Sequence, residues 1–527
     1  MNVGFVKIFS WYLIIFAGLC LSENGVLAEN AGSAASVSIS SGLPGLTDDG
    51  LSHPPPATGA YAYNSFVPAN TAGASYADPV FGSTVRRITT DHNPDDSYAR
   101  NMWWNAAGTR YLHRRADFWD VIDAATGNIT HHAIPIGSYA YDGGFDPVDP
   151  NVLYKYSGST IRKVTLNADG TWTDAVYFTA PAAIKPLGGT LNWFDASGRY
   201  MLVRYGGEPS VRLYDRQNMA AGPYSNLINA SAYINQGHYI GLSPDGQYLV
   251  GYMGSGGYAG SGEGVSWKID HINRSVPKTP NRFWSLCGDH GSFISASDGR
   301  NYMIAGNCYS HPEIWRVDIT NNAAGLNEDQ QRALPNNMRL MLWPTWDNDL
   351  HYSTVAKGPL QDWAFVSTED YSEAFNEGTA DANGFITPWR AYRQEIIAFN
   401  VITGEVRRLA HHRSRSLSSD YYYTPRLSVS WGGEYVAWNS NFNQNGIIDV
   451  YVLAFGAAIV PIDGDINADG TVNYIDLGLF TGRWLTAGAD ADFNHSGLVD
   501  EVDFALLAGN WLQQNSGLSL RDCTRIL

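Results

Sequence analysis

A unit of two strands joined by a glycine-containing turn recurs through residues 74–458, and it constrains the fold more than any other feature of the sequence. An aromatic residue and an apolar run follow each turn, as in AAGTRYLHRR from Ala106, DASGRYMLVRY from Asp195, SPDGQYLVGYM from Ser243, SDGRNYMIAG from Ser297 and WGGEYVAWNS from Trp431. Partner strands such as WDVIDAATG from Trp119 and EIWRVD from Glu313 follow. Two less regular copies begin at Phe145 and Leu340 and bring the count to seven.

Repeats of about 40 to 55 residues, each with several strands, are typical of a β-propeller, because a single blade cannot bury both of its faces. The sequence therefore predicts a mainly β fold with a seven-bladed propeller; six or eight blades also fit the spacing. The segment DPVFGSTVRRIT from Asp78 has only an outer-strand pattern. We expect it to close the ring by pairing with the last blade.

A second repeat, with a period of 27 residues, lies near the C-terminus. Its copies read DINADGTVNYIDLGLFTGRWL from Asp465 and DFNHSGLVDEVDFALLAGNWL from Asp492. Each opens with an oxygen-rich loop of twelve residues, followed by an apolar run with helical spacing that ends in Trp-Leu. Such loops supply the six to eight oxygen ligands that Ca²⁺ prefers. The sequence thus predicts two calcium sites, each beside a short helix.

The ligand positions can be assigned from the loop spacing. In the first loop the predicted ligands are Asp465, Asn467, Asp469, the Thr471 carbonyl and Asp476. In the second loop they are Asp492, Asn494, Ser496, the Leu498 carbonyl and Asp503. Ser496 replaces a carboxylate, so we expect weaker binding in the second loop.

Two loop-helix copies, with Asp at position 12 and no complete entering helix, resemble a type I dockerin. The resemblance covers about a tenth of the chain, residues 461–515. It implies calcium-dependent folding, binding to a cohesin-type module and a place in an assembly that degrades polysaccharides. Residues 461–515 also hold −8 of the net charge of −17, as two calcium loops require.

The N-terminal sequence predicts export. Lys7 precedes an apolar run, and Val26-Leu27-Ala28 offers a cleavage site, so residues 1–28 are interpreted as a Sec-type signal peptide of a secreted or cell-surface protein. Residues 29–73, rich in Ala, Ser, Gly and Pro, are interpreted as a linker or arm, and residues 516–527 as a tail. No later segment is apolar enough to span a membrane, and no basic stripe indicates nucleic-acid binding.

Three cysteines would remain after cleavage of the signal peptide. Cys287 and Cys308 flank one predicted strand, so they form either a disulfide or two buried thiols. Cys523 is left over. The sequence does not decide between these states.

The turn SPDGQYLVGY resembles those of TolB-like propellers, and DPVFGSTVRRIT followed by seven blades is similar to oligogalacturonate lyase-like propellers. That similarity implies a lyase that removes the proton beside a uronic-acid carboxylate. His238, His290, Tyr422 and Arg426 are the candidate base and cation for that step. The stretch that holds a histidine-bound metal in such lyases reads YYYTPRLSVS here and lacks histidine, so a propeller metal is not predicted.

Two functions therefore remain for the propeller. It is either a polysaccharide lyase or glycoside hydrolase, or a non-catalytic domain that binds glycan or protein. The sequence does not decide whether the chain is an enzyme. Two roles fit the many aromatic residues: stacking on sugar rings, or, more simply for most of them, packing in the blade core. The residues concerned include Trp103, Trp104, Trp193, Trp343 and Trp346.

Overall fold

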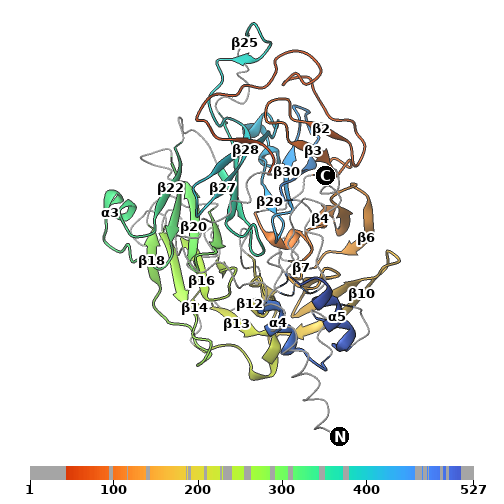
Figure 1. Ribbon diagram of the computed structural model, residues 1–527, viewed down its shortest axis with the longest axis vertical. Coiled ribbons are helices and arrows are strands. Elements are labelled where there is room, and N and C mark those ends of the chain that lie inside the picture. Colours follow the sequence, from red (N-terminus) through yellow and green to blue (C-terminus); the bar gives the residue numbers. More distant parts are fainter. Residues whose placement is uncertain are drawn as a thin grey trace, which may run out of the picture. The chain divides into compact units, whose positions relative to one another are not determined.

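The structure, a computed structural model, describes residues 43–93, 99–115, 117–137, 143–185, 187, 192–206, 210–225, 228–229, 240–253, 263–284, 291–306, 313–342, 350–371, 379–456, 464, 466, 472, 474–486, 491–493 and 498–511. Among these residues the antiparallel strands form seven blade sheets that follow one another along the chain, as Figure 1 shows by colour, and one separate two-stranded hairpin. The predicted seven-bladed propeller is confirmed.

The first four blades use strands in chain order. Blade 1 contains β4 (Arg110–Arg115), β5 (Phe118–Asp123) and β6 (Ile129–Pro135), and the segment after η2 (Asn101–Trp103) completes it through a bridge from Trp104 to Tyr111. Blade 2 contains β7 (Gly143–Phe145), β8 (Val152–Ser157), β9 (Thr160–Leu166) and β10 (Trp172–Thr179). Blade 3 contains β11 (Ile184–Lys185), β12 (Tyr200–Tyr205), β13 (Ser210–Asp215) and β14 (Ile228–Asn229). Blade 4 contains β15 (Ile240–Leu242), β16 (Tyr248–Met253), β17 (Glu263–Lys268) and β18 (Asn281–Trp284).

Blade 5 keeps the chain order, whereas blades 6 and 7 depart from it. Blade 5 contains β19 (Ser292–Ser295), β20 (Asn301–Gly306), β21 (Glu313–Asp318) and β22 (Met338–Leu342). Blade 6 contains β23 (Leu350–Thr354), β24 (Trp363–Thr368), β27 (Glu395–Asn400) and β28 (Val406–His411), and a hairpin of β25 (Thr379–Ala380) and β26 (Ile386–Thr387) is inserted before β27. Blade 7 contains β29 (Ser428–Val429), β30 (Tyr435–Ser440) and β31 (Asp449–Ala454). Short helices are η3 (Arg216–Ala221), α3 (Glu328–Arg332), η4 (Leu417–Ser419) and η5 (Tyr421–Tyr423).

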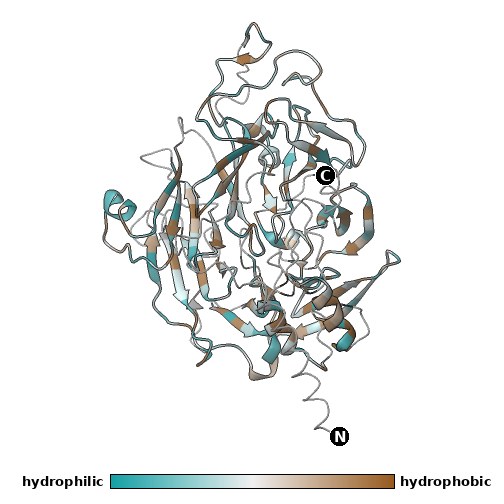
Figure 2. Cartoon of the chain, viewed as in Figure 1, coloured by the Kyte–Doolittle hydropathy of each residue, from teal (hydrophilic) through white to brown (hydrophobic). Residues whose placement is uncertain are grey.

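The N-terminal part of the chain completes blades 6 and 7. Strand β1 (Leu46–Thr47) pairs with β28, and β3 (Thr84–Arg87), itself paired with β2 (Ser75–Ala77), adds to β31 with Val85 opposite Leu453. The predicted closure of the ring by the segment from Asp78 is confirmed. Apolar residues of the blade strands fill the core between the sheets, including Val85, Leu453 and Trp438. The aliphatic residues of these strands are brown in Figure 2.

Replacement of Val85 by Ala tests this closure. Val85 is fully buried between the outer strands of blade 7, so loss of its two methyl groups leaves a cavity and should lower the free energy of unfolding by about 2 kcal/mol. Chemical denaturation measures the change. Val148→Ala, at a residue that is 48% exposed, is the matched control and should change stability by less than about 0.5 kcal/mol. Equal effects of the two substitutions would show that β3 does not hold the ring closed.

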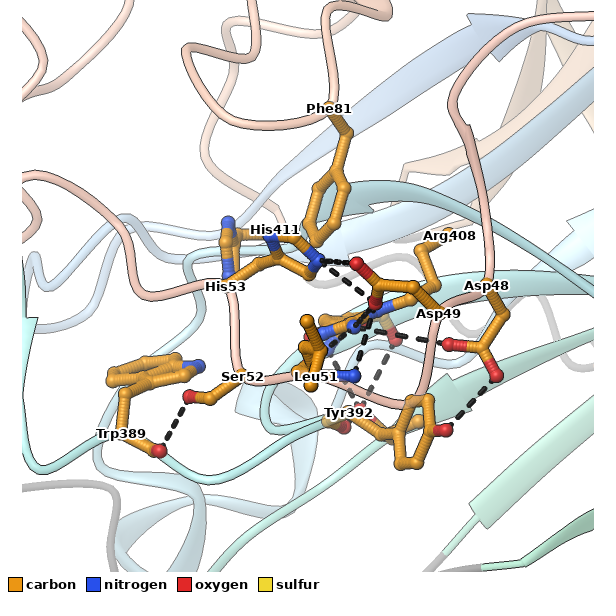
Figure 3. Close-up of polar contacts among 12 residues, drawn as sticks. Asp48, Asp49, Leu51, Ser52, His53, Phe81, Trp389, Tyr392, Arg408 and His411 are labelled. Atoms are coloured by element: carbon orange, nitrogen blue, oxygen red, sulfur yellow. Dashed lines mark hydrogen bonds and ion pairs between the residues drawn. The ribbon is translucent and has the colours of Figure 1, made fainter.

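Four arginines at the end of blade 6 hold the segment before β2, which we call the arm (residues 43–73). Arg407 donates to the carbonyls of Leu43, Pro44 and Gly45, and Arg408 donates to that of Leu51. Arg413 and Arg415 donate to the carbonyls of Tyr61 and Tyr63. Figure 3 shows the arm residues Asp48 to His53 beside Arg408, Tyr392 and Trp389. The described part of the predicted linker or arm is therefore attached to blade 6 by named hydrogen bonds.

Several predictions fall on residues that the structure does not describe. The predicted signal peptide (residues 1–28), the tail (residues 516–527) and Cys287, Cys308 and Cys523 lie outside the described residues. Within the described ranges, we find no helix with the length and apolar character that crossing a membrane requires.

Candidate functional site

The C-terminal segment contains two short helices, α4 (Tyr474–Thr481) and α5 (Glu501–Gly509), that share one small core. Every core residue of the first copy has a counterpart 27 positions later. The pairs are Ile466 with Phe493, Val472 with Val499, Leu477 with Phe504, Phe480 with Leu507 and Trp484 with Trp511. The two copies therefore bury equivalent faces against each other, and neither half has a core of its own.

The backbone also joins the two copies. The amide of Leu485, just after α4, donates to the carbonyl of Val499, and the amide of Val499 donates to the carbonyl of Thr486, both at 2.9 Å. Val499 is fully buried and lies two residues before the start of α5. This exchange places the beginning of the second helix beside the end of the first.

The predicted position-12 ligands, Asp476 and Asp503, are fully buried at the beginnings of the two helices. Asp476 Oδ1 accepts the amide of Ile466 at 2.8 Å, and Asp503 Oδ2 accepts the amide of Asp500 at 2.9 Å. Asp500 caps α5 in return by accepting the amide of Val502. These hydrogen bonds join each loop to its helix, which is the position expected of a predicted ligand that closes the loop.

The donor set fits a calcium ion. Asp492 is 7% exposed, so three of the predicted carboxylate ligands are buried in a segment with a single basic residue, Arg483. Burial of a carboxylate is costly unless it is hydrogen-bonded, paired or bound to a metal. Hard oxygen ligands are those that Ca²⁺ prefers. The predicted ligands Asp465, Asn467, Asp469, Thr471, Asn494 and Ser496 lie outside the described residues, whereas Leu498 is described and 41% exposed.

Comparison with known protein families agrees with this interpretation of the C-terminal segment. Residues 463–511 match the model of the dockerin type I domain. This segment is a dockerin. Dockerin domains bind calcium and imply a cohesin partner, and proteins that carry them are typically extracellular. No curated protein in the comparison matches the chain.

Solved structures share little sequence with the chain. Hydrazine synthase of Kuenenia stuttgartiensis has a TM-score of 0.38 and 12% identity, with 70% of this chain and 98% of that chain covered. The β-propeller domain of Cps50 (Swd1) from Myceliophteria thermophila has a TM-score of 0.34 and 11% identity, with 67% and 96% covered. An auxiliary nutrient binding protein from Bacteroides thetaiotaomicron has a TM-score of 0.29 and 10% identity, with 61% and 70% covered.

Two glycines of the dockerin give a matched test of its packing. The second copy has alanine at both equivalent positions, Ala491 for Gly464 and Ala505 for Gly478. At Gly464 the backbone has a φ of 110°, and a Cβ would lie 2.8 Å from the Cα of Leu507. At Gly478, in α4, a Cβ would meet nothing within 4 Å.

We therefore expect opposite effects from two substitutions that both copy the second repeat. Gly464→Ala should destabilise the calcium-loaded dockerin by at least about 1 kcal/mol, because the new methyl group strains the backbone and meets Leu507. Gly478→Ala should stabilise it by roughly 0.5–1 kcal/mol, because alanine favours a helix. Denaturation at saturating Ca²⁺ measures both. Two effects of the same sign would contradict the packing of Gly464 against α5.

The predicted catalytic residues are only partly described. His238 and His290 lie outside the described residues. Tyr422 and Arg426 belong to the connection between β28 and β29, and the guanidinium carbon of Arg426 lies 5.3 Å from the centre of the Tyr422 ring. Arg426 is 2% exposed. The structure brings these two residues together, and their catalytic roles stay predictions.

Other histidines near this connection have structural roles. His351 Nδ1 lies 2.6 Å from Glu369 Oε1, and both side chains are fully buried. His412 donates from Nε2 to the carbonyl of Thr368 and accepts the amide of Ser414 at Nδ1. Burial lowers the pKa of His412 to about 3, so this imidazole is neutral and fixed in one tautomer.

The described tryptophans named as sugar-stacking candidates belong to the core. Trp103, Trp104 and Trp193 are at most 1% exposed, while Trp343 and Trp346 lie outside the described residues. Within the described ranges no group of three or more His, Cys, Asp or Glu side chains is placed to hold a metal ion. Among the described parts of the chain, the dockerin thus carries the clearest site.

Proposed function

We propose that this protein is secreted and that its dockerin, folded around two calcium ions, attaches the propeller to a cohesin-type module in an assembly that breaks down polysaccharides. The observation that carries the proposal is the dockerin type I match at residues 463–511. Its repeated core and the buried carboxylates Asp476 and Asp503 support it. The attachment role belongs to the dockerin, so it does not depend on whether the propeller is catalytic.

For the propeller we propose action on the polysaccharide itself, as a lyase or hydrolase. The pair of Tyr422 and Arg426 supports the lyase version, because a tyrosine can abstract the proton beside a uronic-acid carboxylate while an arginine neutralises that carboxylate. The alternative is a propeller that only binds glycan or protein. The burial of His351, His411, His412 and Arg426 supports this alternative, because buried side chains are not accessible to a polysaccharide.

Incubation of the full chain with a panel of acidic polysaccharides separates the two versions. A lyase generates unsaturated ends that absorb ultraviolet light, and Arg426→Lys should lower the rate at least tenfold while the folded fraction stays unchanged. A full chain that forms no such ends and no reducing ends on any member of the panel would overturn the catalytic version. Binding of the chain to the same polysaccharides would then support the alternative.

A further inference from the structure

A cavity of about 290 Å³ lies between blades 1 and 2, at the outer rim of the propeller. Its walls are the beginning of β6 and the turn that joins β9 to β10. Arg110, Thr130, His131, Asn151 and Asn167 supply polar groups, and Leu166 and Ala168 supply apolar surface. This volume is near the lower end of the range for ligand pockets, about 300 Å³, and suits a small ligand unit.

The backbone of β6 departs from regular strand geometry beside the cavity. Trp119 pairs with Ile134 and Val121 pairs with His131, so two residues, His132 and Ala133, oppose Asp120 alone. Ala133 has a φ of 54°, which is uncommon for a residue with a side chain. Such bulges redirect side chains and are frequent beside functional sites.

A buried carboxylate holds this bulge. Asp120 is fully buried, and its Oδ1 accepts the amide of Ala133 at 2.9 Å and lies 2.6 Å from His132 Nδ1. The His132 side chain is 61% exposed, whereas its neighbour His131 lines the cavity. The bulge therefore gives two consecutive histidines different surroundings.

The polar groups of the cavity are held in place from one side. Arg110 Nη2 donates to the carbonyl of Pro150 and to Asn151 Oδ1, and Asn167 Nδ2 donates to Thr171 Oγ1. His131 Nε2 donates to the carbonyl of Asn167 at 2.9 Å. Within the described residues, Arg110 Nε, Asn151 Nδ2 and Asn167 Oδ1 make no hydrogen bond. The cavity thus presents preoriented donors and an acceptor to a ligand.

These groups match the hydroxyls of a neutral sugar. A hydroxyl both donates and accepts, and amide and guanidinium groups offer complementary partners in fixed planes. The carboxylates of Asp123 and Asp149 lie near Arg110 and offset its charge, which disfavours an anionic ligand. Burial lowers the pKa of His131, so this imidazole is neutral.

A half-buried tryptophan stands next to the cavity. Trp172 follows the cavity-lining Gly170 by two positions. Its Nε1 donates to the carbonyl of His132 at 3.2 Å, which fixes the indole against β6. The Trp172 ring also packs against the core of the blades, and Lys155 Nζ lies 5.9 Å from the centre of the ring. The tryptophan therefore supports β6 beside the cavity.

We propose that the cavity between blades 1 and 2 binds a neutral glycosyl unit of the polysaccharide. The cavity lies at the strand ends where β4 begins, whereas Tyr422 and Arg426 lie in a connection at the opposite strand ends. A chain bound there is anchored away from the candidate catalytic pair. This inference rests on the proposed function in one respect, because the expected ligand is a unit of the polysaccharide named there.

Calorimetric titration of the full chain with neutral oligosaccharides, such as xylo-, manno- and cello-oligosaccharides, tests the site. Ala168→Tyr fills the cavity from an exposed turn position, and Arg110→Met removes its guanidinium; each should weaken binding at least tenfold. The matched control is Ala125→Tyr, at an exposed alanine in the β5–β6 turn, the equivalent turn of blade 1. It should leave the affinity unchanged.

Three results would overturn the site: no neutral oligosaccharide binds, Ala168→Tyr binds as well as the unchanged chain, or only uronic-acid oligosaccharides bind. Thermal unfolding of each variant checks that the fold is intact. Cohesin binding in the presence of calcium, measured on the same samples, reports on the proposed attachment. A chain that binds cohesin but no neutral sugar would reject this cavity and leave the proposed attachment standing.

Discussion

Replacement of Asp476 by Ala is expected to weaken calcium binding at the first loop of the dockerin by at least about 100-fold, because loss of even a group that only supports a ligand costs 10- to 100-fold. Asp476 is fully buried at the start of α4, where its Oδ1 also accepts the amide of Ile466. The substitution therefore removes a predicted calcium ligand and a hydrogen bond that joins the loop to the helix. Calorimetric titration of the full chain with Ca²⁺ measures the loss.

The same dockerin provides the controls for Asp476→Ala. Asp503→Ala should have the corresponding effect on the second loop, because Asp503 is equally buried and accepts the amide of Asp500. Glu501→Ala removes an exposed carboxylate from the first turn of α5 and should leave the calcium affinity unchanged. Unaltered calcium binding by Asp476→Ala would show that this residue is not a ligand.

The second large effect is expected in blade 6, from replacement of Arg408 by Met. Arg408 pairs with Glu395 through both Nε and Nη2, at 2.7 and 2.5 Å, and both side chains are buried. Loss of the guanidinium leaves the Glu395 carboxylate buried without its cation, which typically costs 3–5 kcal/mol. The arm also loses a donor, since Arg408 Nη1 binds the carbonyl of Leu51. Chemical denaturation should show the destabilisation.

A double substitution distinguishes an unpaired charge from a simple packing defect. Glu395→Gln combined with Arg408→Met removes the charge as well as its partner, so it should recover part of the lost stability. Arg300→Met breaks an exposed pair with Asp298, and the denaturation midpoint should not move. Glu395→Gln alone gives the reference for this comparison. If the losses of stability from Glu395→Gln and Arg408→Met simply added in the double variant, the two residues would not be coupled.

The turns made the blades predictable from the sequence. The turn SPDGQYLVGY places Gly246 at a φ of 69°, and DASGRYMLVRY places Gly198 at 67°. Glycine adopts this conformation without strain, so a glycine at a fixed offset before an aromatic strand marks a turn. The 27-residue repeat was similarly informative, because each core residue of α4 recurs in α5.

The attachment of the arm was not predictable in the same way. Its contacts join backbone carbonyls of residues 43–63 to the side chains of Arg407, Arg408, Arg413 and Arg415, more than 350 positions away. Every residue has a backbone carbonyl, so the acceptors in the arm leave no pattern in the sequence. The two consecutive arginines in β28 were the one available signal, because charged pairs are rare in a buried strand.

The cavity between blades 1 and 2 was also absent from the sequence-based candidates. It depends on the bulge at His132 and Ala133, whose register follows from the hydrogen bonds of Asp120 rather than from a glycine or a proline. By contrast, His411 and His412 are two consecutive histidines at the end of β28, and both are fully buried. In both places the backbone geometry and the burial, rather than the residue type, decide which side chains are accessible to a ligand.

Calcium-dependent attachment is the central claim, and binding to cohesin tests it most directly. The full chain, passed over immobilised cohesin modules of the source organism, should be retained with Ca²⁺ and released when a chelator removes the ion. The chain with both Asp476→Ala and Asp503→Ala should not be retained. A chain that no cohesin retains with calcium, or that stays bound throughout chelator treatment, would contradict the claim.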